Sequence, residues 1–240
     1  MKIDLKQMPL SHLKRMAIAG DQILESFRVL GKSQTNVVAQ VLAHQGTFYE
    51  DEHYPKGDTY DGESGSQYYY HAHRPEAGEH GHFHTFIRAK AIPPAMQPAS
   101  YPGREPSLGG EDAICHLVAI SMDRAGIPIR LFTTNRWVTG ETFYNASDTQ
   151  KLVRRFSVDH VAPCLAMNQW ITAMMVLFRP QIDNLLMARD RTIAAHARRH
   201  PDSDALEDEA LEVTSETPID IDKQIAAVDR AMAYLKRARG

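Results

Sequence analysis

The sequence predicts an α+β protein, with a small antiparallel β-sheet in the middle of the chain and helices before and after it. Two observations predict this class. Apolar residues recur with helical spacing near both ends of the chain, whereas the middle alternates at the period of a strand. Turn-rich connections between the predicted strands fit antiparallel pairing. We expect the sheet to be flanked by the N-terminal and C-terminal helices and to form at most a partial barrel.

The chain length bounds the domain organisation. A chain of 240 residues buries enough surface for a core without disulfides. We expect one α+β domain over residues 1–200, an acidic linker at 201–218 and a C-terminal helix at 219–240 that packs on the domain. The two cysteines, Cys115 and Cys164, cannot build a disulfide framework, and a reducing cytoplasm suits this usage.

Charge and hydropathy narrow the class of partner. The formal net charge is −3 and the pI is near 6.5, so the chain lacks the basic footprint of a general nucleic-acid binder. The longest apolar stretch, 162–178, is interrupted by polar residues and is too short for a membrane span. The first residues show no apolar targeting segment. We therefore expect a cytoplasmic protein with a small-molecule substrate, without nucleic-acid or membrane partners, and with a homodimer as one option.

Helices are predicted from apolar stripes and from their boundary residues. Residues 10–30 carry one broad apolar stripe, with Ser11 as a candidate N-cap and Gly31 as a stop. The acidic segment before the last helix is weakly patterned. Further helices are expected at 35–44, 148–155, 163–178, 180–199 and 219–239.

Strands are predicted in the centre of the chain. An aromatic run at 67–74 and a returning run at 80–89 flank a turn that contains Pro75 and Gly78. A second hairpin is expected from 114–123 and 127–134, joined across a short glycine-containing turn. Residues 46–66 are expected to form a loop with at most a short strand at 47–49, and the proline-rich segment 93–110 is also expected to be a loop.

Histidines concentrate on the first hairpin. The chain has 12 histidines, and five of them fall between His71 and His84. Residues two apart in a strand face the same side, so His71 and His73 share one face, as do His82 and His84. His80 continues the second row beside the turn. Pairing of the two strands would place four or five imidazoles on one patch.

This patch predicts a metal centre. Imidazoles at cross-strand spacing, about 4.5–5.5 Å between Cβ atoms, cannot all be charged without repulsion. Neutral imidazoles direct lone pairs at one point, which a divalent transition metal satisfies. We expect Glu79 or Glu76 to add a carboxylate, with Glu79 as a catalytic group. The expected metal ligands are His71, His73, His80, His82 and His84.

Histidines and a carboxylate without thiolates favour iron first and zinc second. Iron would support an oxygenase-type reaction on a small substrate, including an anionic one, and zinc would support hydrolysis. The motifs of Rossmann cofactor binding, Walker-type phosphate binding and the common zinc proteases are absent from the sequence.

Three alternatives stay open. Haem could bind with His84 or His82 as the axial ligand, covered by the apolar helix that contains Trp170. The protein could store or sense metal without catalysis. The histidines could also be core residues satisfied by neighbouring tyrosines and carboxylates, or an exposed cluster with no physiological metal.

The segment Gly65 to His73 resembles the first half of the first cupin motif, in which a glycine precedes an H-x-H pair. The resemblance implies His71 and His73 as ligands on a β-barrel, with Glu76 or Glu79 as the carboxylate. It covers about fifteen residues, neither glutamate has the usual spacing, and the second cupin motif is missing. The similarity is therefore one of site geometry.

The phrases YYYHAHR, EHGHFHTFIR and LFTTNRWVTGE resemble those of a family of uncharacterised bacterial proteins. This resemblance spans most of the chain and implies no activity.

Other polar residues near the predicted strands are candidates for substrate contact. Arg136 can hold a carboxylate or phosphate bidentately and is a candidate catalytic residue. Arg88, Arg130 and Trp137 are candidate substrate-binding residues, with surface salt bridges and a buried tryptophan anchor as the alternatives. His116 is expected to be a satisfied core residue or a ligand from a third strand.

Overall fold

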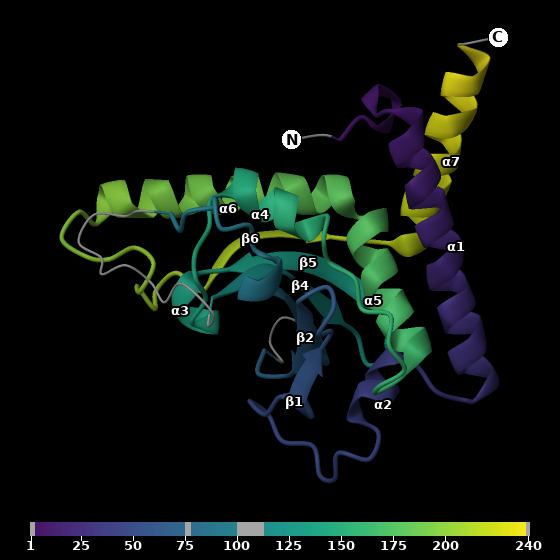
Figure 1. Cartoon of the computed structure of the whole chain (residues 1–240), viewed down its shortest axis with the longest axis horizontal. Coiled ribbons are helices and arrows are strands. Elements are labelled where there is room, and N and C mark those ends of the chain that lie inside the picture. The colour runs from purple at the N-terminus through teal and green to yellow at the C-terminus, as the bar shows by residue number, and fades with distance from the viewer. Residues whose placement is uncertain (1–2, 75–77, 100–112, 239–240) are drawn as a thin grey trace.

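A computed structural model describes residues 3–74, 78–99 and 113–238 of the chain. In this part of the chain, seven α-helices accompany one open antiparallel sheet of six strands. Figure 1 shows helices lying along one side of the sheet, with α1 and α7 side by side at its edge. The predicted α+β class is confirmed. The sheet is open, so its strands do not form a closed barrel.

The strands follow one another in the sheet in chain order, so every neighbouring pair is antiparallel. This arrangement makes both β1 and β6 edge strands, and the connection from β5 to β6 runs through residues 135–212, which contain four helices. The strands are β1 (Tyr54–Tyr60), β2 (Ser66–His71), β3 (Gly81–Arg88), β4 (Ile114–Met122), β5 (Pro128–Thr134) and β6 (Val213–Pro218).

The helices match the predicted stripes closely. α1 packs against α5 and α7, and α6 packs along β5 and β6. None of the described helices is long and apolar enough to cross a membrane. The helices are α1 (Leu10–Lys32), α2 (Val37–Leu42), α3 (Arg136–Thr139), α4 (Ala146–Val153), α5 (Leu165–Leu177), α6 (Arg179–Arg199) and α7 (Ile221–Arg237).

The main core lies between α5 and one face of the sheet. Trp170 of α5 is fully buried, and its ring lies 5.4 Å from the ring of Phe83 on β3. The interruption of this apolar helix at Asn168 is also explained. Its amide oxygen accepts a 2.5 Å hydrogen bond from the hydroxyl of Tyr68, and its nitrogen donates to the backbone carbonyls of residues 160 and 162. The buried amide therefore holds β2, α5 and the preceding loop together.

Two predicted segments differ from the structure, and both differences involve edge strands. The first strand, Tyr54–Tyr60, lies in the segment 46–66 expected to be a loop, and residues 47–49 are irregular. The segment 201–218 expected as a linker supplies β6, which pairs with β5. Both strands are polar because one of their sides faces no neighbouring strand, and the alternation used to predict strands is weak in such segments.

Leu13→Ala in α1 should lower the free energy of unfolding by about 2–5 kcal/mol, because Leu13 is fully buried and its truncation leaves a cavity. Ile18→Ala on the same helix is the matched control, since Ile18 is 66% exposed, and should change the value by about 0.5 kcal/mol or less. Urea titration monitored by circular dichroism measures both. Equal destabilisation by the two substitutions would contradict the assigned face of α1.

Candidate metal centre

The histidine cluster lies on the face of the sheet opposite α5. Tyr68 and Phe83 point toward α5, so the residues next to them on β2 and β3 point to the other face. The pairing of β2 with β3 sets His71 directly opposite His82, and Tyr69 opposite His84. The hairpin register predicted from the sequence is therefore present.

Three histidines offer nitrogen atoms to a common point. Nε2 of His71 lies 2.8 Å from Nε2 of His82. His73, just after β2, folds back so that its ring centre is 4.8 Å from that of His71 and 5.2 Å from that of His82. One nitrogen from each of the three lies within 4.8 Å of the others. The 2.8 Å between His71 and His82 is close to the separation of two ligands of one metal ion, since two ligands at right angles and about 2.1 Å from a metal are about 3.0 Å apart.

Glu79 orients one of these rings. Its Oε1 lies 2.6 Å from Nδ1 of His82, and both side chains are fully buried. A carboxylate accepts the proton on Nδ1, which leaves the lone pair of Nε2 directed at His71. This carboxylate–histidine pairing is the usual support of a metal-binding imidazole. Glu79 therefore lies behind His82, although the sequence also allowed it as a direct ligand.

His84 lies two residues after His82 on β3, and its Nδ1 also contacts a neighbouring side chain. Its Nδ1 lies 2.9 Å from Nε2 of His116 on β4, and the two nitrogens share one proton. When His84 donates that proton, its Nε2 carries no proton and can act only as an acceptor. This atom is buried and has no hydrogen-bond partner in the part of the chain that the structure describes. An unsatisfied imidazole nitrogen inside a protein is costly, and a metal ion is a group that would satisfy it.

Burial keeps these rings neutral. Desolvation is the main cause that lowers the pKa of His71 to about 2 and of His116 to about 3, and it lowers the pKa of His84 well below its ordinary value. Neighbouring imidazoles lower the same pKa values further. Burial opposes ionisation of Glu79, but the hydrogen bond from His82, the hydroxyl of Ser121 and the charge of Arg74 together outweigh it and lower the pKa of this carboxyl. The cluster therefore combines neutral nitrogen donors with one carboxylate.

Side chains from outside the sheet cover this face. Arg74 places its guanidinium 4.8 Å from the centre of the Phe132 ring, and its Nη1 is buried without a hydrogen-bond partner among the described residues. His53 stacks on Tyr69 at 3.6 Å and meets His71 edge to face at 5.6 Å. The cluster is thus enclosed beneath Arg74 and His53, with His71 and His73 only half-buried.

His80 does not join the cluster. Its Nδ1 is 2.6 Å from the hydroxyl of Tyr70, which projects from the opposite face of β2, and its ring stacks on Phe48. Gly81 allows this contact, because a Cβ at that position would lie 2.5 Å from the Tyr70 hydroxyl. The sequence placed His80 in one row with His82, and the structure corrects this: His80 precedes β3 and does not follow its alternation.

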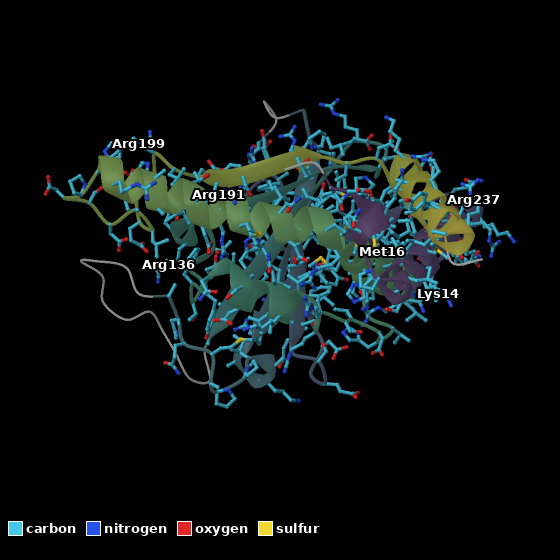
Figure 2. The ribbon with its side chains drawn as sticks, turned by 90° about the horizontal axis from the view of Figure 1, so that it is seen from above. Lys14, Met16, Arg136, Arg191, Arg199 and Arg237 are labelled. Atoms are coloured by element: carbon cyan, nitrogen blue, oxygen red, sulfur yellow. The ribbon has the colours of Figure 1, made fainter. Side chains whose placement is uncertain are left out.

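The predicted substrate residues are dispersed. Arg136 pairs with Glu207 and donates to the backbone of Glu141, and it lies toward the same end of the molecule as Arg199 (Figure 2). Trp137 donates to the carbonyl of Leu211, so it anchors the chain before β6 as the structural alternative proposed.

Arg130 and Arg88 both lie on the histidine face but apart from the cluster. Arg130 pairs with Glu216 at 3.2 Å, and Arg88 donates to Gln67 at 2.5 Å. Of the four candidates, only Arg88 lines a cavity next to the centre.

Haem binding by His84 and Trp170 together is not supported by their placement. Trp170 packs on Phe83, on the opposite face of the sheet from His84. Glu76, the second carboxylate considered, lies outside the described residues.

Sequence reasoning missed Arg74, His53 and Asp58 as neighbours of the centre. Arg74 could have been found, because it directly follows the H-x-H pair. His53 and Asp58 belong to β1 and the loop before it, where the polar sequence gave no strand pattern.

A family model described as a domain of unknown function, DUF6969, matches residues 17–219. The chain belongs to the DUF6969 family. The matched region contains the complete six-stranded sheet and the histidine cluster, so the candidate centre lies within the DUF6969 domain. Neither the curated proteins nor the solved structures contain a match to the chain.

Glu79→Gln should weaken binding of Zn²⁺ to this DUF6969 protein by about 10–100-fold, because the amide holds the His82 ring less firmly and lowers the basicity of its Nε2. Glu216→Gln is the matched control, since Glu216 pairs with Arg130 away from the cluster. Competition with a chromophoric chelator measures both affinities. Equal affinities for the two variants would contradict the role assigned to Glu79.

The metal-free DUF6969 protein should lose stability as the pH falls below about 6.5, the ordinary histidine pKa. The pKa values of His71, His84 and His116 are lowered in the folded protein, so the unfolded chain binds more protons in that range. Each such histidine contributes about 1.4 kcal/mol per pH unit to the slope.

Urea titrations between pH 7 and 5 in the presence of EDTA measure this slope. The double variant H84Q/H116Q removes two of the titrating groups and should show a shallower fall. A stability that is constant or rises on acidification over this range would show that the histidines are not held neutral.

Proposed function

We propose that the protein is a metal-dependent enzyme whose divalent transition metal is held by His71, His73 and His82. The observation that carries the proposal is the convergence of one nitrogen from each histidine within 4.8 Å. The 2.6 Å contact between Glu79 and His82 supports it, because a hydrogen-bonded carboxylate fixes the ring as a lone-pair donor.

Three protein ligands favour catalysis over a purely structural role. Structural zinc sites are closed by four protein ligands, whereas catalytic sites keep a position for water or substrate. Nε2 of His84 is a further imidazole nitrogen that lacks a hydrogen-bond partner among the described residues, and the ring centre of His84 lies 4.8 Å from that of His82. Even with His84 as a fourth ligand, iron, which accepts six ligands, would retain open positions.

An iron-dependent, oxygenase-type reaction on a small anionic substrate is the first candidate activity. When bound, the metal would supply open positions for the substrate and dioxygen. Arg74 supports an anionic substrate, because its Nε pairs with Glu212 at 3.7 Å while its buried Nη1 has no acceptor among the described residues. Tyr69, Phe86 and Phe132 are buried around the cluster and limit the access of bulk water.

Zinc-dependent hydrolysis is the second candidate, and one observation favours it. The sequence favoured iron because it expected a carboxylate among the ligands. Glu79 instead bonds to His82, which leaves a set of imidazoles only, and zinc is found with three histidines in catalytic sites. A protein that stores or senses metal without turnover would use the same ligands and remains the non-catalytic alternative.

His73→Ala and His82→Ala should each reduce the bound metal from one equivalent to a small fraction, because either change leaves only two converging nitrogens. His80→Ala is the matched control on the same hairpin and should retain the metal, since His80 bonds to Tyr70 instead. Elemental analysis after dialysis against excess Fe²⁺ or Zn²⁺ measures the content. Unchanged metal in both cluster variants would refute the proposed centre.

A further inference from the structure

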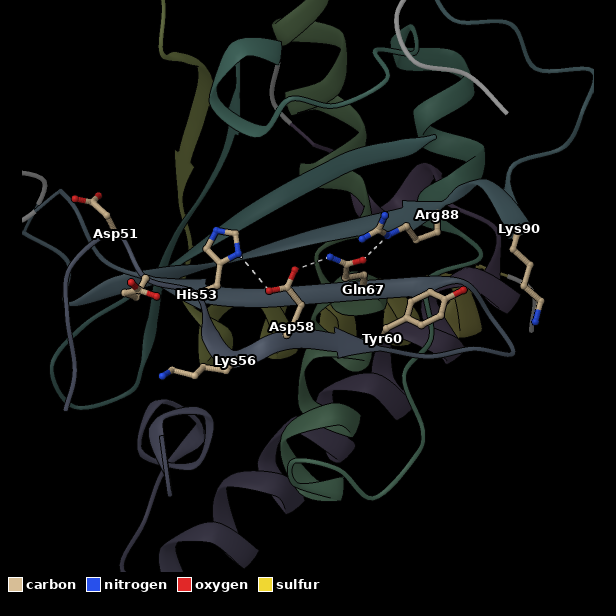
Figure 3. A pocket seen from close by; sticks show the side chains of 10 residues that line it. Asp51, His53, Lys56, Asp58, Tyr60, Gln67, Arg88 and Lys90 are labelled. Carbon is tan, nitrogen blue, oxygen red and sulfur yellow. Dashed lines mark hydrogen bonds and ion pairs between the residues drawn. The ribbon is translucent and has the colours of Figure 1, made fainter. Parts of the chain in front are cut away.

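A polar groove of about 870 Å³ runs along the histidine face at the edge of the sheet. Arg88 and Lys90 stand at one end, and Asp51 stands at the other end beyond His53 (Figure 3). The groove is lined by Asp51, Glu52, His53, Lys56, Gly57, Asp58, Tyr60, Gln67, Arg88 and Lys90.

The acidic end of the groove adjoins the metal centre. The backbone N–H of Asp51 donates to the carbonyl of Ala72 at 3.0 Å, and Ala72 stands between His71 and His73. His53 lines the groove and its ring meets that of His71. A molecule lying in the groove would therefore have one end beside the proposed metal.

A series of hydrogen bonds orients the guanidinium of Arg88 at the other end of the groove. Nε of Arg88 donates to the amide oxygen of Gln67 at 2.5 Å, and the amide nitrogen of Gln67 donates to Asp58 at 2.6 Å. The second oxygen of Asp58 lies 3.2 Å from Nδ1 of His53. These contacts cross β3, β2 and β1 and fix the guanidinium (Figure 3). Its two terminal nitrogens have no protein acceptor among the described residues, so they form a pre-oriented fork for a carboxylate.

The lining determines the chemistry of the occupant. Its three carboxylates and three cationic side chains balance, so one negative charge on the ligand is accommodated more easily than two. The charged side chains that line the groove would lose hydrating water beside an apolar ligand, whereas they can form hydrogen bonds with the hydroxyl groups of a ligand. Tyr60, which is 44% exposed at the cationic end, offers an amphipathic ring to such a molecule.

We propose that this groove binds the substrate, a linear hydroxylated monocarboxylate, with its carboxylate on Arg88 and its opposite end directed toward the metal. The four residue steps from Gln67 to His71 span about 13 Å along β2, which an elongated molecule can bridge and a very short acid cannot. The orientation toward the metal rests on the proposed metal centre, whereas the carboxylate contact with Arg88 does not.

Gluconate is a suitable probe. Isothermal titration of gluconate into metal-free protein should detect binding, and Arg88→Gln should weaken it about tenfold or more, because a charge-assisted bidentate contact is lost. Arg88→Lys, which keeps the charge but not the fork, should also weaken binding. Arg191→Gln, on the surface of α6, is the matched control and should bind as the wild type. Circular dichroism checks that each variant is folded.

The orientation is tested with Mn²⁺-loaded protein. Paramagnetic relaxation of gluconate protons should be strongest at C6, the end away from the carboxylate, and weakest at C2. Strongest relaxation at C2 would mean that the carboxylate binds the metal itself, which would overturn the proposed orientation.

The outcomes separate the two proposals. No binding of gluconate, or equal binding by wild type and Arg88→Gln, would overturn the groove proposal even if the metal binds. Binding that depends on Arg88 without any bound Mn²⁺ would refute the metal centre and leave the groove as a site for hydroxylated acids.

Discussion

The burial of several neutral imidazoles on one face of a β-sheet is the constraint on which this structure depends. His82 and His84 are fully buried, and each uses its Nδ1 for a neighbour, Glu79 or His116. Both Nε2 atoms are then left as acceptors away from bulk water. Protonating the rings is opposed by desolvation, and the Nε2 lone pair of His84, which has no hydrogen-bond partner among the described residues, is costly to leave unsatisfied. A metal ion resolves both problems, because it is a cation that binds neutral nitrogen atoms.

The antiparallel fold provides this face of the sheet. A meander of antiparallel strands lets the helices cover one side of the sheet, where Trp170 and Phe83 form the core. Among the described residues, side chains of short segments, such as Arg74 and His53, lie over the other side. A site on such a face is enclosed enough to lower the histidine pKa values. Such a site also remains open toward the groove at the edge strand β1, so a ligand-binding groove and a catalytic metal site can lie next to each other.

The centre of this sheet could be predicted from the sequence, and its edges could not. His71, His82 and His84 alternate within strongly patterned strands, so period two placed them on one face, and His73 follows His71 by two residues just after β2. His80 was misplaced because alternation ends where β3 begins, and only the contact with Tyr70 shows where the ring goes. Glu79 was predicted near the site, but its role behind His82 depends on the turn geometry. β1 and β6 are polar edge strands, so their sequences resemble loops, and His53 and Asp58 were missed with them.

The most direct test of the central claim is X-ray absorption spectroscopy of the protein loaded with one equivalent of Zn²⁺. The account predicts a first shell dominated by nitrogen atoms about 2.0–2.1 Å from the metal, with the outer-shell scattering of at least three imidazole rings. A first shell of oxygen atoms without imidazole scattering would contradict it. That result would mean that the metal binds at surface carboxylates and that the histidine cluster has a structural role.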